Sequence, residues 1–475
     1  MKPSGFIHNI LKFSIPTVIS AIVALIALPL ISHVVPADNY AVINLFYDYG
    51  TLLALFTPLG LGETFIRFYN ESSYMGRRRI STYYLVISAI NLILIGIVVI
   101  PRFGVEVSSS LFGSESRYFL IALLLYAFMI ALYKITSYEA RAEGNARCYN
   151  MQQVAFILVN RLVYIVPAAL ASEPEFACAF LVAGTSIIGF SAFAARKRPY
   201  FCFKTTVDSM RVSEMVVYGL PTVANSIVLS LLGSINKTML MVNSTPTDAG
   251  IYALGLTIAN IFSFIPAAFC TYWSVYIYQN YKTAKKQIML AHDFIFFASV
   301  ILVCLILSFQ DIVYIFIGNE YADSQSFFML LMLWPIQSLL CETTAYGVNI
   351  SRKTYLLLVS SIILIVVDVV LVVLLTPIFG ATGAAIAFGM ASIVCLISRT
   401  VFGQKYYRTI EKPLRTLVSS LIIFVLCCVN CAVWQAPILH IGISVIAVAM
   451  ALVVYRQKIS SFFSVLKSAF AHGNI

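Results

Sequence analysis

The sequence predicts an all-α integral membrane protein with about fourteen transmembrane helices and no sizeable soluble domain. Three observations carry this prediction: the apolar composition, the length of the apolar segments, and the alternation of basic residues along the chain. Sixty per cent of the 475 residues are hydrophobic, only 11% are charged, and the mean hydropathy is +0.92. A soluble domain of this length would carry roughly a quarter charged residues. The chain therefore needs lipid as its solvent.

The apolar residues form runs long enough to cross a bilayer as helices. A helix needs about 20 apolar residues to do so, and Ile80–Pro101 and Thr354–Pro377 are clear examples. Strands of a membrane barrel alternate apolar and polar residues, and these runs do not alternate. The predicted spans, in chain order, are 10–34, 39–68, 82–101, 118–138, 151–171, 176–195, 215–243, 250–279, 293–309, 325–346, 355–375, 382–402, 416–434 and 437–455.

Basic residues fall on alternate loops between these spans. Of the 31 lysines and arginines, 27 lie on one side of the predicted topology, in eight short segments, and only Arg102 and Arg117 lie on the other. The positive-inside rule therefore predicts that both termini and the 196–214 loop are cytoplasmic. Because the net charge of +11 is spread over eight segments, the chain has no concentrated basic surface for nucleic acid.

Neither the cysteines nor the known catalytic motifs indicate a cofactor. Most of the ten cysteines lie within predicted spans, where a thiol behaves as a small packing residue. Cys428 and Cys431 have the spacing of a metal-binding pair, but they lie in the middle of a helix. No HExxH, GxSxG or Walker sequence occurs. We predict a protein that is not an enzyme and that carries no metal or cofactor.

Two stretches of the chain share a proline pattern at an offset of 205 to 212 residues. The first begins with Ile15-Pro16-Thr17-Val18 and the second with Leu220-Pro221-Thr222-Val223. Each continues with a loop proline, a loop aspartate and a later helix proline, which are Pro36, Asp38 and Pro58 in one copy and Pro246, Asp248 and Pro266 in the other. Six spans separate the copies, so both halves enter the membrane in the same sense. Such parallel repeats are typical of transporters.

Three segments resemble one family of membrane proteins. Residues 39–69, NYAVINLFYDYGTLLALFTPLGLGETFIRFY, are similar to the second helix of polysaccharide-type flippases. Residues 317–321 (IGNEY) resemble the outer loop before their tenth helix, and 377–385 (PIFGATGAA) resemble the turn into their twelfth. The chain thus resembles the Wzx-like oligosaccharide-lipid flippases, in the superfamily that also holds the MATE drug exporters and the lipid II flippases. With the helix count, the resemblance covers nearly the whole chain.

The resemblance implies two six-helix lobes that form a V-shaped cavity. The N-terminal lobe is expected at 1–200 and the C-terminal lobe at 201–411. Residues 412–475 would add two further helices and an amphipathic cytoplasmic tail. Lipid II flippases carry arginines in their first helix, whereas this chain has none between Phe13 and Ser32.

Two cations and three asparagines inside the predicted spans are candidate substrate-binding residues. Arg161 lies mid-span with Asn160 beside it, and a guanidinium matches phosphate geometry; a structural ion pair is the alternative. Lys237 ends a polar stripe on the seventh span, where a lysine that reaches for the interface is equally plausible. Asn44 belongs to a polar stripe on the second span. Asn225 is a weaker candidate, because an interhelical hydrogen bond would also explain it.

Two aspartates inside spans are candidate ion-coupling residues. Asp48 lies deep in the second span, on the same stripe as Asn44. It could carry a proton, pair with Arg161, or serve in a plain structural pair. Asp368 is isolated among valines and isoleucines of the eleventh span, where helix packing is the favoured role. Intramembrane ionisable groups are costly and usually face an interior cavity.

The predicted function is that of a flippase which moves a polyprenyl-pyrophosphate-linked oligosaccharide across a bacterial cytoplasmic membrane by alternating access. The glycan could be an O-antigen, capsule or exopolysaccharide repeat unit, and glycan polymerases and glycosyltransferases are possible partners. A MATE-like drug or cation antiporter shares the fold and is the first alternative. A membrane glycan polymerase or ligase is an alternative from another class, but such enzymes typically have a large outer loop. The largest outer loops predicted here, 102–117 and 310–324, are short.

Overall fold

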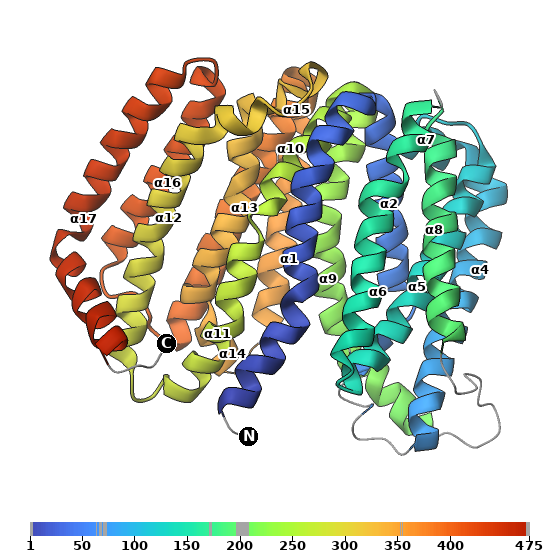
Figure 1. Cartoon of the computed structure of the whole chain (residues 1–475), viewed down its shortest axis with the longest axis horizontal. Helices are drawn as coiled ribbons and strands as arrows, with labels where there is room; N and C mark the ends of the chain where they lie inside the picture. The colour runs from blue at the N-terminus through green and yellow to red at the C-terminus, as the bar shows by residue number, and fades with distance from the viewer. Residues whose placement is uncertain are drawn as a thin grey trace. The chain divides into compact units, whose positions relative to one another are not determined.

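The computed structural model describes residues 3–62, 64–65, 69, 74–170, 173–195, 209–351, 353 and 355–471. Most of the predicted 196–214 loop therefore lies outside the described residues. The chain divides into two compact units, one formed by Met1–Ala253 with Gly318–Glu320 and the other by Leu254–Ile317 with Tyr321–Ile475. Throughout the described residues the regular structure is helical (Figure 1).

The first unit holds the helices up to the start of α10. They are α1 (Pro3–Val34), α2 (Ala37–Phe56), α4 (Tyr74–Phe112), α5 (Arg117–Ala142), α6 (Ala146–Leu158), the π-helix η1 (Val159–Val163), α7 (Ile165–Leu170), α8 (Pro174–Ala194), α9 (Ser209–Asn243) and α10 (Pro246–Ile261). Within this unit α5 packs against α2, α4 and α8, and α2 packs against α9.

The second unit begins within α10 and holds the remaining helices. They are α11 (Phe264–Asn280), α12 (Lys285–Tyr314), the 3-10 turn η2 (Asn319–Tyr321), α13 (Ser324–Thr344), α14 (Tyr346–Ile350), α15 (Tyr355–Tyr406), α16 (Pro413–Val433) and α17 (Pro437–Ala471). The turn η2 is shared, because its first two residues belong to the first unit. Here α13 packs against α11, α12, α15 and α16, and its most apolar stretch is 83% buried. A helix that is apolar on all sides belongs in such a central position.

Twelve helices among the described residues are long and apolar enough to cross a membrane. One of them, α15, contains two predicted spans, because Gly380 (φ 53°, ψ −133°) interrupts its helical backbone. The second predicted span, 39–68, corresponds to α2 and the helical residues that follow its break. The predicted all-α membrane fold with about fourteen helices is confirmed. Many large apolar side chains face outward, as a lipid solvent requires; Ile97 is 66% exposed and Ile438 is 86% exposed.

Proline starts several of these helices and marks breaks in others. Pro174 and Pro413 occupy the first turns of α8 and α16, where the missing N–H costs nothing. α2 ends in a turn at Thr57–Gly60 that contains Pro58, and α10 ends in a turn shortly before Pro266. The two copies of the sequence repeat therefore break at equivalent places. Their spatial relation by a rotation stays a prediction, as do the lobe boundaries at 200 and 411.

An aromatic cluster joins α2 to α5 in the first unit. Phe46 packs edge-on against Phe119, with ring centroids 5.3 Å apart, and lies 5.2 Å from Tyr126. The ring of Tyr126 also occupies the space where a Cβ on Gly50 would stand. A side chain at position 50 would push the helices apart, so this glycine sets how closely α2 approaches α5.

The last helix continues beyond its membrane span. α17 runs as one helix from Pro437 to Ala471, so the backbone of the tail is helical, as predicted. Its placement on a membrane interface stays a prediction. α12, α16 and α17 pack on one another within the second unit (Figure 1).

Candidate functional site

The polar stripe predicted on α2 is a distinct face of that helix. Phe46 and Gly50 are fully buried towards α5, whereas Asn44, Asp48 and Thr51 recur at helical spacing and are only half-buried. Residues three and four apart share one face of a helix. This arrangement leaves the polar face of α2 for contact with α9.

Asp48 forms an ion pair with Lys237 of α9. The Lys237 ammonium donates to Asp48 Oδ2 and lies 3.5 Å from Asn44 Oδ1. Ser234, one turn earlier on α9, also donates to Asp48 Oδ2, at 3.2 Å. The lysine side chain is only 4% exposed, whereas that of Asp48 is 22% exposed. The carboxylate is therefore the accessible member of the pair.

A second polar contact fixes the α2–α9 packing beside the ion pair. The Tyr49 hydroxyl and the Thr238 Oγ1 are 2.7 Å apart and share a hydrogen bond. Thr238 also donates to the Ser234 carbonyl, at 3.0 Å. Because Tyr49 and Thr238 each follow a member of the ion pair, this bond holds Lys237 in register with Asp48.

Arg161 lies on the π-helical turn η1, where the backbone of the fifth span widens. Its neighbour Asn160 accepts a hydrogen bond from the Tyr126 hydroxyl and donates to the Phe156 carbonyl, at 2.9 Å. Asn160 thus ties η1 to α5. Arg161 itself is half-buried and makes no hydrogen bond or ion pair with any described residue. Its charge acts on Tyr47 and Tyr164 by electrostatic interaction alone.

Two predicted residues do not belong to this cluster. Asn225 is half-buried on α9, about three turns before Lys237. Asp368 is fully buried on α15, in the second unit. The structure therefore brings Asn44, Asp48 and Lys237 together, keeps Asn160 and Arg161 as neighbours on η1, and leaves Asp368 in a different unit.

The second unit contains a buried charge network that sequence analysis did not identify. Asp293 of α12 pairs with Arg415 of α16, and both side chains are at most 6% exposed. Arg415 also lies over the ring of Tyr455, 5.6 Å from its centroid. Lys458 of α17 is 4.0 Å from Asp293 and pairs with Glu411. The network fastens α16 and α17 to α12.

Two more buried polar groups of the second unit were also missed. His292 is fully buried between the hydroxyls of Thr343 and Thr416, each 3.0 Å from a ring nitrogen. Glu342, inside the predicted span 325–346, accepts a hydrogen bond from the Cys270 thiol at 3.3 Å. Its position within an apolar run was the available clue.

A family model described as "Polysaccharide biosynthesis protein" matches residues 6–273, which are more than half of the chain. The chain belongs to the polysaccharide biosynthesis protein family. The predicted resemblance to a polysaccharide family is thereby confirmed. The matched region contains the Asp48–Lys237 pair and Arg161. No curated protein sequence matches the chain.

Solved structures with the same fold include a flippase and several exporters. The lipid II flippase MurJ in an inward closed conformation is similar with a TM-score of 0.63 and 15% identity, over 94% of this chain and 99% of that one. A MATE family multidrug resistance transporter of the MOP superfamily is similar in its inward-facing conformation, with a TM-score of 0.56 and 15% identity over 87% of this chain and 99% of that one. An outward-facing MATE family transporter is similar with a TM-score of 0.53 and 16% identity, over 87% of this chain and 96% of that one. These similarities show the fold of this polysaccharide biosynthesis family member.

Proposed function

We propose that this chain is a flippase that moves a polyprenyl-pyrophosphate-linked oligosaccharide across the cytoplasmic membrane of a bacterium by alternating access. The observation that carries the proposal is Arg161, a guanidinium within a membrane span that has no anionic partner among the described residues. An intramembrane cation is costly and is usually retained for function. In a protein of the polysaccharide biosynthesis family, a lipid-linked pyrophosphate is the anion that best explains it.

The Asp48–Lys237 pair would supply the switch. Lys237 is fully compensated while Asp48 is ionised, so it offers little attraction to a substrate phosphate. A proton taken up by the accessible Asp48 carboxylate would release the ammonium for the phosphate, and loss of that proton would restore the pair. Ser234 would then hold the neutral aspartic acid by a hydrogen bond, and Asn44 would lie beside the released ammonium. Asn160 and Asn225 would offer further polar contacts, and Asp368 would be a second ion-coupling group.

The proposal also includes the orientation of the chain in the membrane and the two lobes that move during transport. The charge distribution of 27 basic residues on one side against two on the other supports cytoplasmic termini. Residues 1–200 and 201–411 would act as the two lobes, with 412–475 attached. Glycan polymerases and glycosyltransferases that make or use the same lipid-linked glycan are the expected partners.

A MATE-like antiporter is the second candidate, and the accessible carboxylate of Asp48 favours it. In that mechanism an organic cation and a proton or sodium ion would compete for Asp48, because a drug-binding cavity requires an anion. The structural similarity to MATE family transporters is compatible with it. Arg161, which has no anionic partner among the described residues, argues against it, since a guanidinium in a drug-binding cavity would repel a cationic drug.

Transport by the purified protein in vesicles separates the two candidates. Lipid-linked oligosaccharide placed in one leaflet should appear in the other at a rate that depends on the protein, while a cationic dye should not be exported. Vesicles with the Arg161→Ala protein serve as the matched control. Dye export driven by a proton or sodium gradient, without glycan translocation, would reject the flippase.

A further inference from the structure

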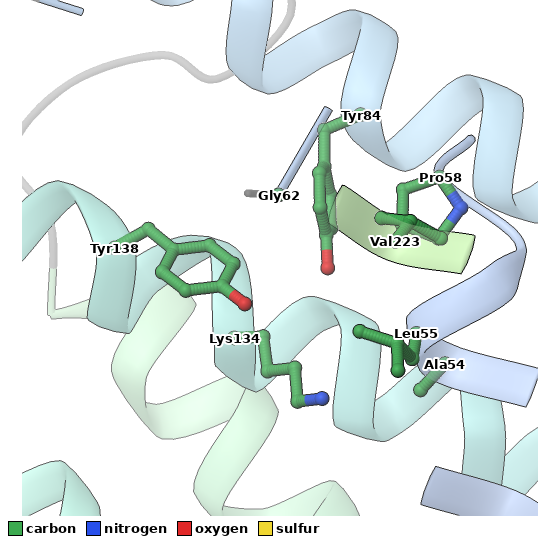
Figure 2. A pocket seen from close by; sticks show the side chains of 8 residues that line it. All are labelled: Ala54, Leu55, Pro58, Gly62, Tyr84, Lys134, Tyr138 and Val223. Carbon is green, nitrogen blue, oxygen red and sulfur yellow. The ribbon is translucent and has the colours of Figure 1, made fainter. Parts of the chain in front are cut away.

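Lysine side chains lie near tyrosine rings in both units, and the two places differ in their access. In the first unit, Figure 2 shows Lys134 and Tyr138 of α5 with Tyr84 of α4 around one small gap. The gap has room for about one water molecule, and each of the three side chains already has an interaction within the protein. That place is too small for a ligand. In the second unit the corresponding lysines are exposed.

Two glycines build the exposed place by bringing α14 against the end of α15. A Cβ on Gly347 would overlap the carbonyl of Gly403, and a Cβ on Gly403 would overlap the carbonyl of Thr344. Only glycine allows the two backbones to approach so closely. The same contact places Lys353 beside the end of α15, and the Lys353 N–H donates to the Val348 carbonyl at 3.1 Å. Its backbone is therefore held in position.

One tyrosine ring at the end of α15 attracts two ammonium groups. The Lys353 ammonium lies 4.8 Å from the centroid of the Tyr406 ring, and the Lys405 ammonium lies 5.9 Å from it. A cation within about 6 Å of an aromatic ring is attracted by the negative face of that ring. Both lysines are exposed, whereas Tyr406 is half-buried. The ring thus gathers two charges that would otherwise repel each other.

The next tyrosine extends this arrangement to the end of α11. The Tyr407 hydroxyl donates to the Tyr281 carbonyl at 2.6 Å, and the two rings meet edge to face with centroids 6.1 Å apart. The Lys282 ammonium lies 5.7 Å from the centroid of the Tyr281 ring. Lys282, Lys353 and Lys405 therefore form a lysine cluster that aromatic rings hold at one end of the second unit.

The charges of the lysine cluster are not neutralised by the part of the chain that the structure describes. None of the three lysines forms an ion pair or a hydrogen bond through its ammonium with a described residue. Neighbouring charges of one sign repel each other, and an anion between them removes the repulsion. The complementary group is therefore expected to come from another molecule.

An exposed apolar stripe of α15 leads directly to the lysine cluster. Ile397, Val401 and Lys405 are four residues apart, so they follow one another along one face of the helix. Ile397 and Val401 are both more than half exposed, as expected for side chains that face acyl chains. A molecule that lies along this face would place its apolar part on the stripe and its polar end at Lys405. A phospholipid has this form.

We propose that the lysine cluster binds the headgroup of an anionic phospholipid, whose acyl chains lie along the exposed stripe of α15. The three ammonium groups pair with the phosphate and the two tyrosine rings fix where they stand. The cluster belongs to the basic segments on the proposed cytoplasmic side, where anionic lipids attract lysines. The site goes beyond the proposed function, because neither candidate transport mechanism requires a bound phospholipid.

Native mass spectrometry of the purified full-length protein, titrated with phosphatidylglycerol, tests the inference. Lys353→Gln combined with Lys405→Gln should weaken the tightest phosphatidylglycerol site by about tenfold or more. Tyr406→Leu removes the ring but no charge, and should weaken that site severalfold. Tyr406→Phe keeps the ring and should bind as the wild type does. Phosphatidylcholine, which has no net charge, should bind more weakly and should not respond to the lysine variants.

A double variant elsewhere in the second unit is the matched control. Lys286→Gln combined with Lys412→Gln also removes two exposed lysines, but neither lies over a ring in the structure, so binding should stay at the wild-type level. Equal weakening in both double variants would reduce the effect to net charge and overturn the site. Wild-type affinity after loss of Lys353 and Lys405, or equal affinity for the two lipids, would also overturn it.

Melting temperatures show whether the variants remain folded. Without added lipid, the Lys353 and Lys405 double variant should melt close to the wild type, and phosphatidylglycerol should stabilise the wild type more than the variant. If the double variant is unstable without lipid, Lys405→Gln alone decides by the same titration. Polyglutamate that displaces phosphatidylglycerol from the wild type at equal charge concentration would indicate an acidic protein partner and overturn the lipid assignment.

Discussion

Two ion pairs among the described residues differ in how well they are sealed from their surroundings. In the first unit, Asp48 pairs with Lys237 and keeps 22% of its side chain exposed. In the second unit, Asp293 pairs with Arg415, and its side chain is only 2% exposed. The second pair is further enclosed by Tyr455 and Lys458. The same chemistry therefore occurs once with an accessible carboxylate and once without.

This difference distinguishes an ion pair that can take part in transport from one that only holds helices together. A sealed pair cannot exchange its partner for a substrate or a proton without local unfolding, so Asp293 and Arg415 are suited only to hold helices together. An accessible carboxylate can change its partner while the helices stay packed. Burial of the acid, more than the identity of the pair, indicates the role.

The largest expected effect is on the sealed pair. Asp293→Asn should leave Arg415 buried without its carboxylate, which costs about 3–5 kcal/mol of folding free energy. We expect a marked fall in the amount of protein in the membrane, measured by immunoblot, and a lower melting temperature. Asp293→Asn combined with Arg415→Gln should restore part of both. Normal abundance of the single variant would show that this pair is not structural.

The accessible pair should respond differently. Lys237→Met leaves the Asp48 carboxylate with Ser234 and access to its surroundings, so abundance should fall less than for Asp293→Asn. Glycan export, measured by complementation of a strain that lacks its own flippase, should be lost. Lys237→Arg is the control that keeps the charge and should retain partial export. Loss of protein as severe as that of Asp293→Asn would remove the distinction between the two pairs.

Arg161 extends the same reasoning to a charge that has no anionic partner in the part of the chain that the structure describes. Arg161→Ala leaves no buried anion behind, so the protein should remain as abundant as the wild type. Export should stop or fall steeply, and Arg161→Lys should retain part of it through charge alone. The same complementation assay and immunoblot report both quantities. Full export by Arg161→Ala would exclude this residue from the site.

The smallest effect is expected at the exposed edge of the sealed network. The hydrogen bond from the Lys458 ammonium lowers the pKa of Glu411 below its ordinary value of 4.5. The pair therefore stabilises the fold fully at pH values above 4.5, and this contribution to stability is lost as the pH falls through the lowered pKa of Glu411. Glu411 is 42% exposed and screened by solvent, so Glu411→Gln should cost less than about 1 kcal/mol at pH 7. The melting temperatures of the variant and the wild type should converge at acid pH; a constant difference would assign the effect to packing.

The fold was largely readable from the sequence because lipid imposes simple rules. A span must be long, apolar and helical, so the runs 355–375 and 382–402 were both recognisable as separate spans, and the helical backbone is interrupted between them at Gly380. The break after α2 was not predicted, because the predicted span 39–68 runs through Pro58, although a proline inside an apolar run was the available signal. The widened turn at η1 was not predicted either, since a π-helical turn depends on packing and has no composition of its own.

The site was predicted only in part, because the sequence does not show which charged side chains lie close enough to form ion pairs. Asp48, Lys237 and Arg161 were identifiable as charges inside apolar runs. Their partners were not: Asp48 could have met Arg161, and the structure instead places it against a lysine 189 positions away in the chain. Asp293 and Arg415 were missed because each lies at the edge of a span, where a charge is expected in a loop.

The π-helical turn at Val159–Val163 has a consequence for sequence length. A π-turn holds one residue more than an α-helical turn, and the added residue is absorbed locally, so α6 and α7 keep the faces they would present in an unbroken helix. Deleting one residue here would return the segment to a regular α-helix with its flanks still in register. A relative that is one residue shorter at this point could therefore keep the packing contacts of the fifth span. It would lack the additional side chain that the wider turn carries.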